Sequence, residues 1–208
     1  MLFIFTIWEA RNKAIFKNIW TPINISSALL VQKVQEHRTA PKIGKHRKII
    51  ALVINKSTAW PFFDGASQGD LAIGGAGGVI CITDSKKITY KLGMGRATKT
   101  RAELMAHWAT LKIEKYKQIA NLNIYGDSKT VIEWAQERNT IQAPHLQNFL
   151  RIIQSMLPCF AALNFNHVYR EFNSEADILS KQALAIQPGI IQGEIFDEGD
   201  SIMFHIPL

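Results

Sequence analysis

The stretch from Trp60 to Leu92, WPFFDGASQGDLAIGGAGGVICITDSKKITYKL, decides how the chain is expected to fold. An apolar run at Trp60–Asp64 predicts a strand that ends in an acid, and the glycine-rich segment Gly65–Gly78 predicts a turn. Two further strands are predicted over Val79–Thr83 and Ile88–Leu92, separated by polar residues typical of a hairpin. The globular part of the chain is therefore expected to begin with three consecutive strands.

After these strands, helical and strand patterns alternate along the chain. Apolar spacing predicts helices over Arg101–Tyr116, Asp127–Arg138, Pro144–Met156 and Ser174–Ile186, and strands over Leu122–Tyr125 and Ala161–Tyr169. The order is three strands in a meander, then helix, strand, two helices, strand and helix. This order predicts an α/β fold in which one mixed sheet is flanked by helices.

Charge divides the chain of 208 residues into unequal parts. Residues 1–58 carry 10 Lys or Arg against 2 acids, whereas residues 59–208 carry 14 against 15, so the net charge of +7 comes from the first segment. We expect a basic, helical N-terminal segment and linker (1–58, with helices over 1–20 and 24–38), a globular domain (59–187) and a C-terminal tail (188–208). The basic segment is either a solvated tail or a nucleic-acid contact.

The composition also bears on where the protein acts. No apolar stretch reaches the ~20 residues of a membrane span. The apolar start, MLFIFTIW, lacks the basic region and cleavage site of a signal peptide. Two cysteines are too few for a disulfide framework. We expect an intracellular monomer in the nucleus or cytoplasm, with no membrane partner.

Four acids stand at the ends of predicted elements: Asp64, Glu103, Asp127 and Asp177. Three have a local explanation, because Asp127 can cap the helix that follows it, and Glu103 and Asp177 can complement a helix dipole. Asp64, a charge directly after two phenylalanines, is the hardest to explain in this way. As a group they indicate a metal site, since clustered carboxylates repel one another without a cation and Mg²⁺ prefers oxygen ligands. Two such ions, roughly 3.5–4 Å apart, can activate water and stabilise a leaving oxygen in phosphodiester hydrolysis.

These acids lie in the motifs FFDGAS, TRAEL, IYGDS and HVYREFNSEAD, which occur in that order. The series resembles the type 1 ribonuclease H family, above all the plant variety associated with reverse transcriptases of non-LTR retrotransposons. The tract IWEARNKAIF resembles the segment that precedes the domain in such proteins. The resemblance implies a five-stranded mixed sheet flanked by helices, and an endonuclease that cleaves the RNA strand of RNA–DNA hybrids. It also implies two Mg²⁺ ions, with Mn²⁺ as a substitute, and it makes Asp64, Glu103, Asp127 and Asp177 the catalytic metal ligands.

The resemblance assigns further residues around these acids. It places nucleic-acid contacts at Gly65, Ala66, Ser67, Lys99, Thr100 and Asn173, and a proton-transfer histidine at His167. Local alternatives stay open, because His167 can be a structural strand residue and Asn173 can cap the last helix. Where the family commonly has an asparagine just ahead of the AEL motif, this chain has Lys99 and Thr100. Lys99 brings charge without the paired donor and acceptor of an amide.

Two other functions remain compatible with the sequence. A transposon-derived module could bind nucleic acid with weak catalysis or none, although the presence of all four acids favours an active nuclease. A relative on the same fold, such as an exonuclease or an integrase, is the second alternative. The tract HVYREFNSEAD and the spacing of the acids disfavour it.

Overall fold

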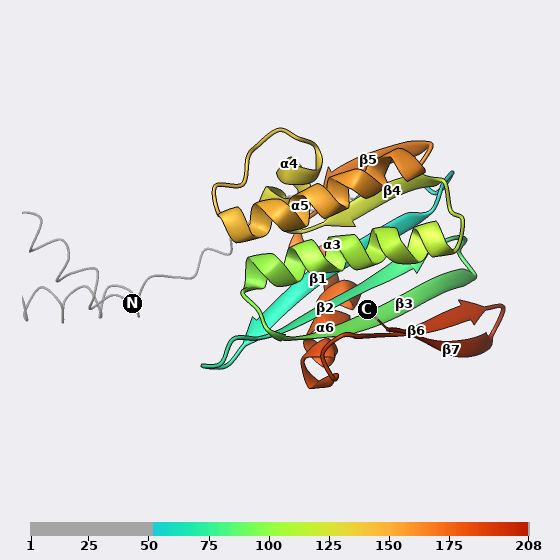
Figure 1. Cartoon of the computed structure of the whole chain (residues 1–208). Helices are drawn as coiled ribbons and strands as arrows, with labels where there is room; N and C mark the ends of the chain where they lie inside the picture. Colours follow the sequence, from blue (N-terminus) through green and yellow to red (C-terminus); the bar gives the residue numbers. More distant parts are fainter. Residues whose placement is uncertain (1–51, 208) are drawn as a thin grey trace, which may run out of the picture. The chain divides into compact units, whose positions relative to one another are not determined.

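The computed structural model describes residues 52–207, so the helices predicted over 1–20 and 24–38 lie outside the described residues. Seven strands form one sheet in the order β5-β4-β1-β2-β3-β6-β7 (Figure 1). The predicted class, a mixed α/β fold with a mixed sheet, is confirmed. The predicted number of five strands is wrong, because the last residues of the chain add two.

Each of the five strands and four helices predicted after Ala59 corresponds to an element of the structure. The strands are β1 (Trp60–Gln68), β2 (Ile73–Cys81), β3 (Lys86–Arg96), β4 (Asn121–Gly126), β5 (Ala162–His167), β6 (Ile190–Asp197) and β7 (Asp200–Pro207). The helices are α3 (Lys99–Tyr116), α4 (Lys129–Ala135), α5 (Pro144–Met156) and α6 (Ser174–Gln182), with 3-10 turns η1 (Leu157–Cys159), η2 (Arg170–Phe172) and η3 (Ala183–Ala185). Within residues 52–207 no helix has the length and apolar character that crossing a membrane requires.

The sheet is covered on both faces, and the alternation of side chains along β1 explains how. Phe63 packs into the larger core with Leu104 of α3 and Ile153 of α5. Its neighbour Phe62 points to the other face and packs in a smaller cluster with Ala176 of α6. Helices α3, α4 and α5 therefore form one layer, and α6 covers the opposite face (Figure 1).

The glycine-rich segment that follows Asp64 is mostly strand, and the turn predicted over Gly65–Gly78 is wrong. β1 continues to Gln68, and only residues 69–72 form the turn to β2. The glycines allow close packing of helices on the sheet. A Cβ atom at Gly65 would lie 2.1 Å from the backbone nitrogen of Glu103, and one at Gly75 would lie 2.4 Å from the Ser180 carbonyl oxygen.

The two additional strands form a hairpin within the segment predicted as a tail. β6 pairs antiparallel with β3, and β7 pairs antiparallel with β6. Glu198 and Gly199 make the turn with φ angles of +49° and +98°. This is the geometry that hairpins most often achieve with Asn-Gly or Asp-Gly, so Glu-Gly gave only a weak signal in the sequence.

Candidate active site

Two of the four acids are brought side by side by the parallel pairing of β1 with β4. Phe63 is the partner of Gly126 at the end of this register, so the next residues along the chain are Asp64 in β1 and Asp127 directly after β4. The alternative role of Asp127 as a helix cap is wrong, because Ser128 holds the N-cap position of α4. The Asp127 Oδ1 atom instead accepts a hydrogen bond of 3.1 Å from Asn173 Nδ2.

The Asp64 carboxylate is buried in the middle of β1, with 3% of the residue exposed. Its Oδ2 atom accepts a hydrogen bond of 3.1 Å from Ser180 Oγ on α6. Its Oδ1 atom is also buried and has no hydrogen-bond partner among the described residues. Burial, followed by the negative charge of Asp127, raises the pKa of Asp64 from its ordinary 3.8 to about 7, against opposing effects of Ser180 and Lys99.

Glu103 reaches the same region from the second turn of α3, one turn later than predicted, and 8% of the residue is exposed. Its Oε2 atom accepts a hydrogen bond of 2.6 Å from Ser128 Oγ, and Lys99 Nζ lies 3.7 Å from Oε1. Burial raises the pKa of Glu103, the bond from Ser128 and the charge of Lys99 oppose the rise, and Asp127 adds to it. The mutual influence of Asp64, Glu103 and Asp127 indicates three carboxylates close enough to repel one another.

Asp177 lies in the first turn of α6, as predicted, but cations surround it. Arg170 Nη2 donates to Oδ1 at 2.6 Å, and Lys181 Nζ donates to Oδ2 at 2.5 Å. Partial burial acts to raise the pKa of Asp177, but the bonds from Lys181 and Arg170 outweigh it and hold the pKa below its ordinary value. The hydrogen bond to Asp177 also raises the pKa of the Arg170 guanidinium, and the charges of Asp127 and Asp64 add to that rise.

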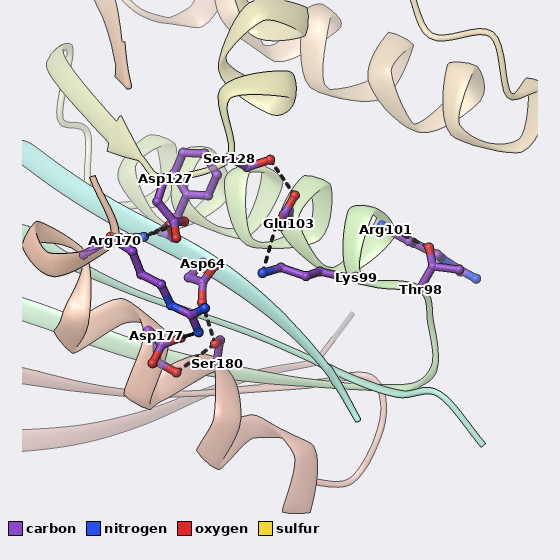
Figure 2. Close-up of polar contacts among 12 residues, drawn as sticks. Asp64, Thr98, Lys99, Arg101, Glu103, Asp127, Ser128, Arg170, Asp177 and Ser180 are labelled. Atoms are coloured by element: carbon purple, nitrogen blue, oxygen red, sulfur yellow. Dashed lines mark hydrogen bonds and ion pairs between the residues drawn. The ribbon is translucent and has the colours of Figure 1, made fainter. Parts of the chain in front are cut away.

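A shallow cleft of about 110 Å³ is bordered by two of the four acids, whereas Glu103 and Asp127 do not line it. It is lined by the acids Asp64 and Asp177, by the cations Lys99, Arg170 and Lys181, and by Gly65, Ala66, Ser67 and Gln68 of β1. Figure 2 shows Asp64 between the acid at the end of β4 and the acid on α6, with Glu103 on the α3 side. In residues 52–207 no three acidic, histidine or cysteine side chains lie close enough together to hold a metal ion as they stand. Each acid instead accepts hydrogen bonds from its own partner. Ser180 donates to Asp64, Ser128 to Glu103, and Asn173 to Asp127. Arg170 and Lys181 both donate to Asp177.

Asn173 links the elements that carry the acids, and it is 1% exposed. Its Nδ2 group donates to the Phe63 carbonyl oxygen at 2.9 Å as well as to Asp127. It stands at the N-cap position of α6 but makes no capping hydrogen bond with its side chain. Burial leaves this side chain inaccessible in the structure as it stands, so the arrangement favours a structural link between α6, β1 and β4.

The other residues assigned by resemblance fall into two groups. Gly65, Ala66, Ser67 and Lys99 line the cleft, although Ser67 Oγ donates to the Ala97 carbonyl oxygen at 2.9 Å. Thr100 and His167 do not line it. His167 is the exposed last residue of β5, lines a separate depression beside α4, and places Nε2 3.2 Å from the Asp127 carbonyl oxygen.

Four polar residues at the site were missed by the sequence reasoning. Ser128 and Ser180 bind Glu103 and Asp64, and Arg170 and Lys181 bind Asp177. One signal was available, since Lys181 follows Asp177 by four residues on a predicted helix. The contacts of Ser128 and Ser180 depend on tertiary packing that no local pattern encodes.

A mixed sheet with helices on both faces, and acids meeting where β1 and β4 run side by side, defines a domain of the ribonuclease H type. Solved structures agree with this class. The chain is 28% identical to the N-terminal RNase H domain of a Mycobacterium tuberculosis protein, with a TM-score of 0.57 over 61% of this chain and 93% of that one. It is 26% identical to RNase H1 of the archaeon Halobacterium salinarum, with a TM-score of 0.56 over 61% of this chain and 97% of that one.

The chain belongs to the reverse transcriptase-like family, whose model matches residues 62–183. Among curated proteins it is 30% identical over 129 residues to an Arabidopsis thaliana protein provisionally named as a ribonuclease H protein. This match covers 61% of the present chain and 20% of the relative, so the chain corresponds to about a fifth of that protein. The matched family region contains all four acids and ends before β6.

Proposed function

We propose that this domain is a divalent-metal-dependent endonuclease that cleaves the RNA strand of RNA–DNA hybrids, with two Mg²⁺ ions or with Mn²⁺ in their place. The main observation in support of the proposal is the environment of the Asp64 carboxylate. Its carboxylate is buried beside Asp127, and one of its oxygens has no partner among the described residues. A buried carboxylate with a free lone pair and acidic neighbours is a poor contributor to stability, but it is well suited to a cation.

The donor set fits the proposed metal. Asp64, Glu103 and Asp127 offer only carboxylate oxygens, and the charges of Asp127 and Glu103 both act on Asp64. Hard cations such as Mg²⁺ and Mn²⁺ prefer such ligands. Bound metal would neutralise phosphate charge and lower the pKa of an attacking water. Asp177 would complete the ligand set once it is released from the cations that now hold it.

The residues that line the cleft would bind the substrate. Lys99 offers a positive charge to a phosphate, and the backbone at Gly65, Ala66 and Ser67 can approach the 2′-hydroxyl groups that distinguish RNA from DNA. We assign proton transfer to His167, which is exposed to solvent and lies beside the Asp127 backbone. Because His167 does not line the cleft, this role requires its imidazole to approach the leaving group of the bound substrate.

A second function, binding of nucleic acid without cleavage, is favoured by two observations. Asp177 is paired with two cations. Among the described residues, no three acidic, histidine or cysteine side chains are grouped closely enough to hold a metal ion. If this arrangement persisted with nucleic acid present, the domain would retain its cationic cleft but would lack a complete ligand set. Cleavage in the presence of Mg²⁺ is therefore the property that separates the two functions.

The experiment is a cleavage assay on an end-labelled RNA–DNA hybrid, with Mg²⁺, with Mn²⁺ and with a chelator, using the wild-type chain and Asp127→Asn. We expect metal-dependent cleavage by the wild type and a loss of at least about 100-fold in the variant, because a formal charge beside Asp64 is removed. The amide is nearly isosteric, so the melting temperature should not fall. Wild-type binding of the hybrid without cleavage in either metal would support the second function, and full turnover by the variant would remove Asp127 from the site.

A further inference from the structure

Arg170 is the feature of the cleft that the proposed function leaves unexplained. It lies in η2, the short turn between β5 and α6, and its side chain is 63% exposed. Even so, it is not directed into solvent, because its Nη2 atom lies 2.6 Å from Asp177 Oδ1. Arg170 is therefore paired with an acid of the candidate metal site, although its position would also allow full hydration.

The guanidinium of Arg170 lies among the acids. It lines the same cleft as Asp64 and Asp177. Figure 2 shows the side chain reaching Asp177, and the negative charges of Asp127 and Asp64 also act on the guanidinium. The positive charge thus stands within the set of carboxylates that would otherwise attract a cation. The Arg170 guanidinium and a metal ion would compete for the Asp177 carboxylate, because both are cations that bind the same oxygens.

Arg170 and Lys181 differ in how they are attached. Lys181 lies four residues after Asp177 on α6, so it is carried by the same helix as the acid that it contacts. Arg170 comes from a separate element and is the more exposed of the two, at 63% against 45%. A change of side-chain rotamer is enough to move Arg170 away while α6 stays in place. Its planar fork also matches the oxygens of a phosphate diester better than a lysine ammonium does.

We propose that Arg170 is a positioning residue that exchanges partners: it holds Asp177 in the free protein and moves to a phosphate of the bound nucleic acid when Asp177 takes a cation. This inference rests on the proposed function. In the free protein Arg170 acts as an internal counter-ion that spares the acids mutual repulsion. With substrate bound, the guanidinium neutralises a phosphate, and Asp177 becomes available to the metal. Metal and nucleic acid then bind cooperatively, because each removes one partner of the same ion pair.

The first test measures Mg²⁺ binding by titration calorimetry on the full chain without nucleic acid. Arg170→Gln should bind Mg²⁺ about fivefold more tightly than the wild type, the factor that corresponds to loss of a competing exposed ion pair. Arg151→Gln is the matched control, since Arg151 is an exposed residue of α5 that does not line the cleft. Arg170→Lys keeps the charge and should stay within about twofold of the wild type. Melting temperatures establish that each variant is folded.

The second test measures binding of an RNA–DNA hybrid as a function of salt, in an Asp127→Asn background that prevents cleavage. Arg170→Gln should weaken binding and reduce the slope of log affinity against log salt by about 0.9, a B-DNA value applied to the hybrid. A static ion pair that only anchors η2 would lower the melting temperature but would change neither the Mg²⁺ affinity in this direction nor the salt slope.

The outcomes separate the inference from the function on which it rests. Tighter Mg²⁺ binding together with a smaller salt slope supports the exchange. If the wild type binds Mg²⁺ and Arg170→Gln binds it equally or more weakly, or if the salt slope is unchanged, the exchange is overturned and the proposed nuclease stands. If neither protein binds Mg²⁺ at millimolar concentration, the proposed function fails and the exchange fails with it.

Discussion

At Asp64, burial and a neighbouring negative charge act in the same direction on one carboxyl group and raise its pKa to about 7. Between its ordinary pKa of 3.8 and this value, the folded protein holds more protons at Asp64 than the unfolded chain does. The folded state therefore loses stability as the pH rises through this window. This cost is the reason that we regard the carboxylate as functional.

Asp64→Asn should therefore stabilise the metal-free protein at high pH. We expect the variant's advantage in free energy of unfolding to grow by about 2–4 kcal/mol between pH 4 and pH 8, following the shift of the pKa. Urea denaturation of both proteins in chelator, across this range, measures the change. A difference that does not depend on pH would mean that Asp64 titrates normally.

The wild type must be compared with Asp64→Asn because His107 also makes the stability of the fold depend on pH. This histidine lies one turn after Glu103 in α3, stacks on Phe63, and neither of its buried ring nitrogens has a hydrogen-bond partner among the described residues. Burial lowers the pKa of His107 to about 4, so the folded state loses stability as the pH falls from the ordinary 6.5 toward that value. In the wild type this loss opposes the gain at Asp64 over the same window, and only the difference between the two proteins isolates Asp64.

At the scale of elements, the position of α6 depends on glycines in β2. A Cβ atom at Gly77 would lie 2.4 Å from the backbone nitrogen of Ser180 and 2.5 Å from the carbonyl carbon of Leu179. Both are backbone atoms, so α6 itself would have to move to accommodate a methyl group. Because α6 carries Asp177 and Ser180, the close approach of helix to strand sets the width of the cleft.

Gly77→Ala should therefore impair the site more than its effect on stability would suggest. We expect a loss of about 1–3 kcal/mol in stability from overpacking, and a fall in Mg²⁺ affinity and cleavage measured well below the melting temperature. Gly193→Ala is the control, because its Cβ atom would collide with the Phe204 ring at 2.0 Å in the β6–β7 hairpin, outside the cleft. Equal losses of Mg²⁺ affinity in both variants would contradict the role of α6 packing.

Some parts of the fold could be predicted from local patterns in the sequence, and others depend on contacts between distant segments. Helix α5 was predicted with its bounds because Pro144 starts it and its apolar residues keep a helical period. The run Gly74–Gly78 was included in the turn predicted over Gly65–Gly78, since a local pattern cannot separate a glycine that bends the chain from one that allows a helix to pack closely on a strand. The four acids were found because their motifs are local, whereas the partners Ser128, Asn173 and Ser180 come from distant segments.

At the scale of the whole molecule, the β6–β7 hairpin extends the sheet beyond the region that the family model matches. Pairing with β3 gives that strand a second neighbour, and Ile191 is fully buried against the core. Phe204 and Ile206 also pack against the main core cluster. The hairpin is thus continuous with the domain in structure, even though its acidic, weakly patterned sequence was predicted as a tail.

Removal of residues 188–208 should destabilise the domain while leaving the residues of the cleft in place. Loss of one fully buried isoleucine alone corresponds to about 2–5 kcal/mol, and the exposed edge of β3 would invite association between chains. We expect a lower urea midpoint and concentration-dependent aggregation, together with a Mg²⁺ affinity near that of the full chain at low temperature, because no cleft residue lies beyond Lys181. A truncated chain with an unchanged midpoint would show that the hairpin contributes nothing to the stability of the sheet. A truncated chain that stays folded but binds Mg²⁺ much more weakly would show instead that the hairpin supports α6 from the far side of β3.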